Sequence, residues 1–178
     1  MLNYHLIAEL YRPPKIEYLL IGEAPPPSGE YFYKPMKLAL WTKIENDKSL
    51  PSTIFNHYFD KRPESDDEYL SFLYLLKERG IFLVDIIDEP IKVSDRSYYG
   101  WVNPGNLNKV IEGIDTLMDR LNQRGIEMEE DRMIFLLARK HYERNIREAF
   151  PSSYRINWKD FKMKTKACLC CGAYSSEV

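Results

Sequence analysis

Short apolar runs alternate with amphipathic segments along this chain of 178 residues. The runs at 18–21, 81–87 and 133–138 are almost continuously apolar, which is typical of strands buried on both faces of a parallel sheet. Between these runs, apolar residues recur at the spacing of an amphipathic helix. The pattern predicts helices over 2–11, 35–44, 65–79, 103–125 and 140–148, and a short fourth strand or an extended segment over 154–158.

The order of these elements predicts the fold class. Strands that alternate with helices imply βαβ crossovers, which place helices on both faces of a parallel sheet. We therefore expect an α/β protein, a three-layer α/β/α sandwich with a central parallel four-stranded sheet. The polar stretch 46–63 is predicted to be irregular, because Pro51 and Pro63 interrupt it. Residues 1–166 are expected to form a single domain, and 167–178 a flexible tail.

Local signals mark the ends of two predicted helices. Ser65 is followed three residues later by Glu68, the pattern of a capping box at a helix N-terminus. Gly80 follows the same helix and can end it in a left-handed conformation. Pro104 suits the first turn of the next helix.

A carboxylate follows the first predicted strand. Gly22 and Glu23 end the apolar run, and Pro25 begins a run of three prolines. Prolines have a fixed φ and no N–H for a ladder, so the strand passes into a stiff loop. Open α/β sheets bind ligands at the carboxyl ends of their strands, which makes Glu23 a candidate for general-base chemistry or for stabilising a cation. The structural alternative is that Glu23 caps a helix or binds Arg12.

A second carboxylate, Asp85, lies inside the second apolar run. Burying a carboxylate that has no partner costs free energy on the order of several kcal/mol. Because parallel strands share a carboxyl edge, the end of this strand and Glu23 are expected to lie close together.

The distribution of charge is more informative than its sum. A net charge of −2 and a pI near 6.0 give no global basic footprint for nucleic-acid binding. Residues 64–89 carry eight acidic and two basic side chains, whereas 139–166 carry nine basic and three acidic ones. This asymmetry could orient the C-terminal third on a polyanion, or it could simply reflect two solvated faces of opposite sign.

No stretch approaches 18 consecutive apolar residues, and the N-terminus lacks a basic-then-apolar signal pattern, so we expect a cytoplasmic protein without membrane contact. The three cysteines, Cys168, Cys170 and Cys171, crowd near the C-terminus. They form neither a disulfide framework nor the paired spacing of a zinc site, and are assigned to the tail.

The segment Ile21-Gly22-Glu23-Ala24-Pro25 closely resembles the first motif of the uracil-DNA glycosylase superfamily, in the branch that has Gly-Glu-Ala-Pro after its first strand. Three further segments resemble later features of that family: the aromatic run Tyr31, Phe32 and Tyr33; the strand segment Val84, Asp85 and Ile86; and the turn Phe150, Pro151, Ser152 and Ser153.

This resemblance implies a sheet of strand order 2-1-3-4 and a glycosylase that removes a flipped-out base from DNA. Glu23 would position water or stabilise the oxocarbenium-like sugar. Contacts to the base are implied for Gly22, Ala24, Asp85 and a stacking ring from Phe32 or Tyr33. Contacts to DNA phosphates are implied for Pro151, Ser152, Ser153, Arg139, Lys140, Arg144 and Arg147. The expected protein is a monomer that needs no metal and no cofactor.

The chain departs from the family pattern at the base-reading positions. Asp85 stands where the family usually has an asparagine, and a carboxylate can only accept hydrogen bonds unless it is protonated. Phe150 stands where a histidine is usual, and His141 is the candidate substitute. No cysteine precedes Cys168, so the iron–sulfur cluster of this branch is not expected.

These departures leave two alternatives to an enzyme that excises uracil or a related base. One is a non-catalytic relative that binds nucleic acid or protein. The weaker one is an unrelated α/β protein that binds a nucleotide at the same edge, since no glycine-rich phosphate loop is present.

Overall fold

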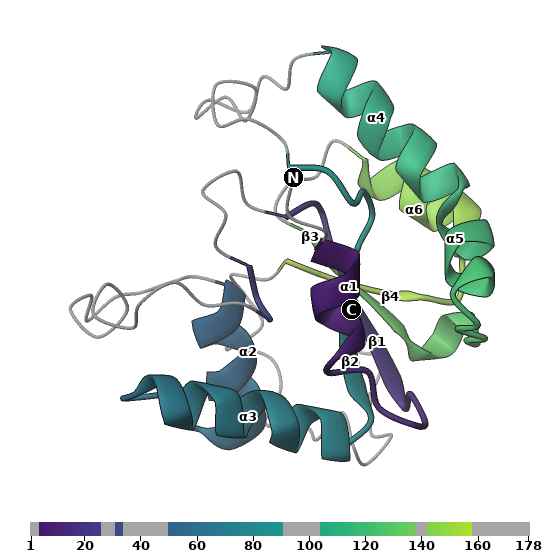
Figure 1. Cartoon of the computed structure of the whole chain (residues 1–178). Helices are drawn as coiled ribbons and strands as arrows, with labels where there is room; N and C mark the ends of the chain where they lie inside the picture. Colours follow the sequence, from purple (N-terminus) through teal and green to yellow (C-terminus); the bar gives the residue numbers. More distant parts are fainter. Residues whose placement is uncertain (1–3, 26–30, 34–49, 91–103, 138–141, 158–178) are drawn as a thin grey trace, which may run out of the picture.

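The computed structural model describes residues 4–25, 31–33, 50–90, 104–137 and 142–157 (Figure 1). Within these ranges, four parallel strands form one sheet in the order β2-β1-β3-β4. The strands are β1 (Tyr18–Gly22), β2 (Ile81–Asp85), β3 (Met133–Leu137) and β4 (Tyr154–Asn157). This is the order that the resemblance implied. The first three strands fall within the apolar runs that predicted them, and β4 falls within the predicted 154–158 segment.

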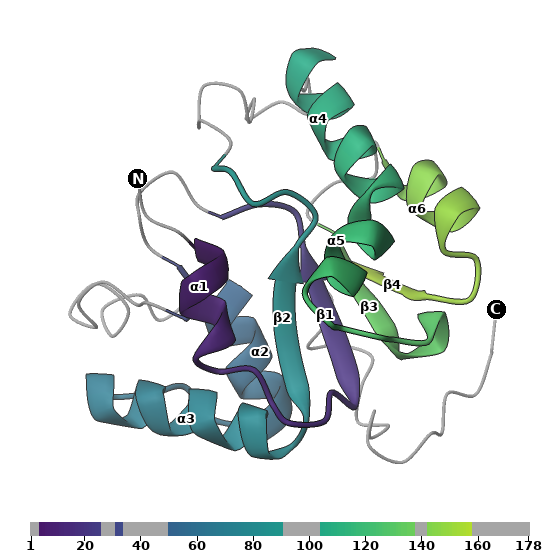
Figure 2. The ribbon, with the colours of Figure 1, turned by 45° about the vertical axis from the view of Figure 1, so that its right-hand side comes forward.

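Helices flank the sheet on two sides, as the sequence predicted for an α/β/α sandwich. The helices are α1 (Tyr4–Glu9), α2 (Leu50–Phe59), α3 (Asp66–Glu78), α4 (Pro104–Asp115), α5 (Leu117–Gln123) and α6 (Glu143–Ala149). The first three lie on one face of the sheet, and the last three lie together on the opposite face (Figures 1 and 2). This arrangement follows from right-handed crossovers, because the chain moves one way from β1 to β2 and the other way from β2 to β3.

The register of the sheet fixes which residues reach its carboxyl edge. Gly22 pairs with Asp85 across β1 and β2, and Ile21 pairs with Phe135 across β1 and β3. The residues of β1 from Leu19 to Gly22 are buried, as expected of a strand covered on both faces. The edge beyond Gly22 is therefore where a functional group can emerge from the core.

The ends of α3 confirm the predicted local signals. Ser65 is the N-cap, and its Oγ accepts a hydrogen bond from the backbone N–H of Glu68 at 3.1 Å. Gly80 follows the helix at a φ of 72°, a conformation that favours glycine. A Cβ at position 80 would also lie 2.7 Å from Cγ of Glu17, so both backbone and packing require glycine there.

The prediction of an irregular 46–63 segment is wrong, because α2 occupies residues 50 to 59. Pro51 is the second residue of this helix, where a missing N–H breaks no intrahelical hydrogen bond. Ile54 and Phe55 are fully buried and dock the helix on the core. Proline was thus a sign of a helix start instead of a break.

The single helix predicted over 103–125 is divided at Thr116 into α4 and α5. The Thr116 hydroxyl donates a hydrogen bond to the carbonyl of Glu112 at 2.8 Å, a back-bond that often bends helices. The second strand is shorter than predicted and ends at Asp85.

Several predictions concern residues outside the described ranges. They are the helix over 35–44, the cysteine-bearing tail 167–178, and His141 with its neighbours Arg139 and Lys140. Among the described helices, none combines the length and the apolar content needed to cross a membrane.

Candidate functional site

The Gly22–Glu23 segment is held at the carboxyl edge by backbone hydrogen bonds that continue beyond the strands. Ile86 donates its N–H to the carbonyl of Gly22 at 2.9 Å, and Ile87 donates to the carbonyl of Glu23 at 3.3 Å. These two hydrogen bonds lie beyond the end of β2 at Asp85 and fix the backbone of Glu23. A carboxylate on such a backbone is better positioned than one on a free loop.

The side chain of Glu23 is half-buried and makes one hydrogen bond with a described side chain. The Tyr142 hydroxyl donates to Oε2 at 2.6 Å. Within the described part of the chain, Oε1 of Glu23 has no hydrogen-bond partner. One oxygen is therefore fixed and the other can accept a hydrogen bond from water or a ligand. The alternative pairing of Glu23 with Arg12 is wrong.

Asp85 reaches the same edge from the neighbouring strand. Its side chain is 8% exposed, and its Oδ1 would lie 2.5 Å from a Cβ at Gly22. The absence of a side chain at Gly22 therefore makes room for this carboxylate over the loop. The Asp85 charge also acts on the nearby phenols: burial first, and then Asp85, raise the pKa of Tyr31.

The two carboxylates have different surroundings. Asp85 lies near Tyr31 and Tyr33, whereas Glu23 contacts Tyr142, which precedes α6. Successive side chains along a strand alternate between faces, and Asp85 is level with Gly22, one residue before Glu23. The structure brings both residues to one edge, as predicted, and aims them at different neighbours.

One residue of the aromatic run, Tyr33, hydrogen-bonds the backbone of the edge strand of the sheet. β2 is an edge strand, and the Tyr33 hydroxyl accepts a hydrogen bond from the Leu83 N–H at 2.7 Å and donates to the Leu83 carbonyl at 3.2 Å. The carbonyl of Phe32 accepts from the Tyr69 hydroxyl at 2.8 Å. Both Phe32 and Tyr33 are only 5% exposed. These contacts give the two rings a structural role, and stacking on a base stays a prediction.

The late turn lies away from Glu23. Phe150 to Ser153 connect α6 to β4, so they precede a strand and lie at the amino edge. Tyr154 is level with Leu20 through Ile134, which places Ser153 about 13 Å from Glu23 along the strand direction, at about 3.3 Å per residue. The turn and Glu23 therefore lie at opposite strand edges.

Contacts within the turn explain its residues. The carbonyl of Phe150 accepts hydrogen bonds from the Ser153 hydroxyl at 2.8 Å and from Arg155 at 3.2 Å. The Phe150 ring is buried against Phe135. Pro151 and Ser152 are exposed, and the Ser152 N–H donates to Glu130 at 3.2 Å. Phosphate binding by Pro151, Ser152 and Ser153 stays a prediction for that other edge.

The basic side chains of α6 are paired within the helix. Arg144 forms an ion pair with Glu148 at 2.7 Å, and Arg147 forms one with Glu143 at 3.3 Å. Both pairs join residues four apart and are exposed, so each contributes little to stability. These arginines can exchange their partners for phosphates at little cost, but α6 itself carries no excess of positive charge.

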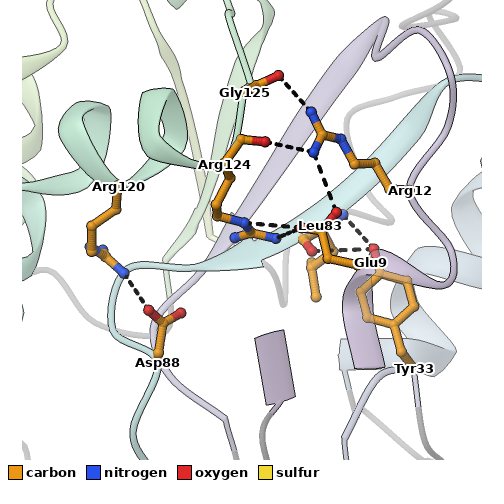
Figure 3. Close-up of polar contacts among 8 residues, drawn as sticks. All are labelled: Glu9, Arg12, Tyr33, Leu83, Asp88, Arg120, Arg124 and Gly125. Atoms are coloured by element: carbon orange, nitrogen blue, oxygen red, sulfur yellow. Dashed lines mark hydrogen bonds and ion pairs between the residues drawn. The ribbon is translucent and has the colours of Figure 1, made fainter. Parts of the chain in front are cut away.

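Ile86 and Ile87, which follow β2 and hydrogen-bond the backbone of Gly22 and Glu23, are themselves anchored to α4 and α5. Arg120 donates to the carbonyl of Ile86. It also pairs with Asp88 at 3.1 Å (Figure 3). Gly113 of α4 packs so closely that a Cβ there would lie 2.6 Å from Cγ2 of Ile87. The sequence pattern gave no sign of this packing, because it depends on contacts between distant elements.

A second polar cluster joins α1 to the end of α5. Arg12 donates to the carbonyls of Arg124 and Gly125 at 2.7 and 2.6 Å, and Glu9 accepts from Arg124 at 2.7 Å (Figure 3). These contacts satisfy carbonyls at a helix C-terminus, where cationic side chains are favourable. This cluster is structural and explains why Arg12 is not available to Glu23.

Tyr142 is the residue of the site that the sequence reasoning missed. The implied strand order could have predicted it, because β3 neighbours β1 and the residues that follow the two strands meet at the same edge of the sheet. No group of three or more histidine, cysteine, aspartate or glutamate side chains within the described ranges could hold a metal ion. Comparison with protein-family models, curated proteins and solved structures finds no match to this chain.

Proposed function

We propose that this chain hydrolyses the N-glycosidic bond of a deaminated or damaged base, uracil or a related one, that has been flipped out of DNA. The observation that carries the proposal is Glu23, a half-buried carboxylate at the carboxyl edge of a parallel sheet. Its Oε2 is fixed by Tyr142, and its Oε1 has no hydrogen-bond partner among the described residues. Open α/β sheets place their ligands at this edge. The Gly-Glu-Ala-Pro resemblance supplies the class of reaction.

In this mechanism Glu23 acts on the sugar. As the bond between C1′ and the base nitrogen breaks, the base leaves with the electron pair and positive charge develops on the sugar. Oε1 of Glu23 orients a water for attack on C1′ and accepts the proton that this water loses, and the carboxylate charge stabilises the developing cation. The base that leaves with the electron pair takes a proton from solvent. A correctly placed group of this kind contributes about 10²–10⁴-fold in rate.

The base would lie beside Gly22 and Ala24 and meet Asp85. An ionised Asp85 accepts hydrogen bonds and so favours a base edge that presents N–H groups, whereas a protonated Asp85 also offers a donor. Flipping costs a few kcal/mol, on the order of one lost stacking and pairing interaction, and costs least for mismatched or damaged bases. This chemistry favours deaminated bases without selecting uracil among them.

A non-catalytic nucleic-acid or protein-binding module is the second candidate. It is favoured by the burial of Phe32 and Tyr33, which are packed as structural rings, and by the position of the Phe150–Ser153 turn away from Glu23. Such a module would bind DNA with a steep dependence on salt and release no base.

The proposal is tested with single- and double-stranded oligonucleotides that contain uracil, hypoxanthine or xanthine. Wild-type protein is expected to release at least one of these bases and leave abasic sites that alkali cleaves. Glu23→Ala should lose this activity, and Glu112→Gln, an exposed acidic position on α4, should keep it. Salt-sensitive binding without release of any base would replace the enzyme by the second candidate.

A further inference from the structure

Tyr142 meets Glu23 from a different part of the chain. It is the N-cap residue of α6, 119 residues after Glu23 in sequence, and its ring is 2% exposed. Its hydroxyl nevertheless reaches the half-buried carboxylate. A fully buried ring that ends on a functional carboxylate is a rigid anchor.

The length of the hydrogen bond indicates its type. The distance of 2.6 Å from the Tyr142 hydroxyl to Oε2 falls in the range of about 2.5–2.7 Å for a hydroxyl that donates to a carboxylate. Hydrogen bonds to charged groups are roughly twice as strong as neutral ones. A contact of this strength is sufficient to select one orientation of the Glu23 carboxylate.

Without such a contact, Glu23 would have no fixed orientation. A glutamate side chain has three rotatable bonds, and the described contacts of Glu23 fix its backbone through Ile87 and its head group through Tyr142 alone. Catalysis by a carboxylate requires the reacting oxygen to be held within a fraction of an ångström. The hydroxyl of Tyr142 meets this requirement by fixing Oε2 and leaving Oε1 available.

We infer that Tyr142 is the positioning residue of the reaction: its hydroxyl orients the Glu23 carboxylate so that Oε1 faces the water and the sugar. This inference rests on the proposed function. Tyr142 does not touch the substrate, so its loss affects the chemical step more than binding. Tyr142 thus acts by orienting Glu23 and not by contacting the substrate.

The first test needs no substrate. The carboxyl ¹³C resonance of Glu23 is identified in labelled protein as the signal that Glu23→Gln removes, and is then followed in Tyr142→Phe. This variant keeps the ring and removes one hydroxyl. The Glu23 signal is expected to shift or broaden. Tyr69→Phe, which removes a buried hydroxyl that donates to the carbonyl of Phe32 and not to Glu23, should leave it in place.

The second test uses whichever base the wild-type protein releases. Tyr142→Phe is expected to lower kcat by about tenfold and to change KM by less than twofold. An unmoved Glu23 signal, or an unchanged kcat, would overturn the role of Tyr142. If the wild-type protein releases no base, the proposed function fails. The carboxyl signal still decides whether Tyr142 orients Glu23.

Discussion

Replacing Gly22 by alanine tests the close approach of Asp85 to the Gly22–Glu23 segment. A Cβ at position 22 would lie 2.5 Å from Oδ1 of Asp85, but 3.6 Å from its Cγ and 3.7 Å from the carbonyl of Val84. The last two distances are ordinary contacts, so the whole overlap falls on one carboxylate oxygen. Because Asp85 is 8% exposed, the oxygen has little room to move, and Gly22→Ala should destabilise the fold by about 1–3 kcal/mol.

A double-mutant cycle isolates this overlap. Asp85→Ala removes the oxygen, so Gly22→Ala should cost less than about 0.5 kcal/mol in that background. The free energy of unfolding is measured by urea denaturation for the wild type, both single variants and the double variant. The expected coupling between positions 22 and 85 is therefore about 1–3 kcal/mol.

Gly125→Ala provides the matched control. Gly125 has a φ of 64°, and its added Cβ would meet nothing closer than Arg12 at 4.0 Å, so its cost of about 1 kcal/mol comes from the backbone alone. Its effect should add to that of Asp85→Ala within about 0.5 kcal/mol. Equal additivity for Gly22→Ala would refute the placement of the Asp85 carboxylate over Gly22.

Two further variants test contacts that join α4 and α5 to the rest of the fold. Gly113→Ala would place a Cβ 2.6 Å from Ile87 and 2.8 Å from the carbonyl of Ile86; it should lower stability by about 1–3 kcal/mol, and an unchanged urea midpoint would contradict the packing. Burial raises the pKa of Glu9, but hydrogen bonds and charge from Arg124 outweigh it and hold that pKa below 4.5. The stability that Glu9 contributes is therefore complete above about pH 4.5 and lost as the pH falls through the folded-state pKa. Glu9→Gln should cost about 1 kcal/mol at pH 7 and flatten the acid limb of stability against pH, and superimposable acid limbs would exclude this linkage.

The positions of the first three strands could be predicted from the sequence, because a strand buried on both faces is a continuous apolar run. The apolar runs that became β1, β2 and β3 need no tertiary information, and their alternation with helices predicts the parallel sheet. The position of Glu23 at the carboxyl edge follows from the same pattern. The start of α3 at Ser65 was predictable because a capping box acts within one turn.

The missed features depend on context that a linear pattern does not hold. Pro51 is compatible with a break and with the first turn of a helix, and the packing of Phe55 decides between them. The contact of Tyr142 with Glu23 spans 119 residues and becomes visible only with the strand order. The aromatic residues after the loop suit a binding surface, yet Tyr33 satisfies the backbone of an edge strand.

The placement of the late turn was open to a topological argument. A segment that joins a helix to the following parallel strand lies at the amino edge, and Ser153 directly precedes β4. From the sequence, the turn was assigned to DNA contacts because its residue types resemble a family motif, without regard to strand direction. Strand direction is therefore the safer guide to which motifs can share a site.

The rate of base release by Glu23→Gln, relative to the wild type, tests the central claim most directly. The amide keeps the size of the side chain and an oxygen that can accept from Tyr142, but it removes the charge. With enzyme in excess over an oligonucleotide that the wild type processes, the variant should react at least about 100-fold more slowly. Its DNA affinity should stay within about twofold. A variant that releases the base at the wild-type rate would contradict the assignment of Glu23 as the catalytic carboxylate.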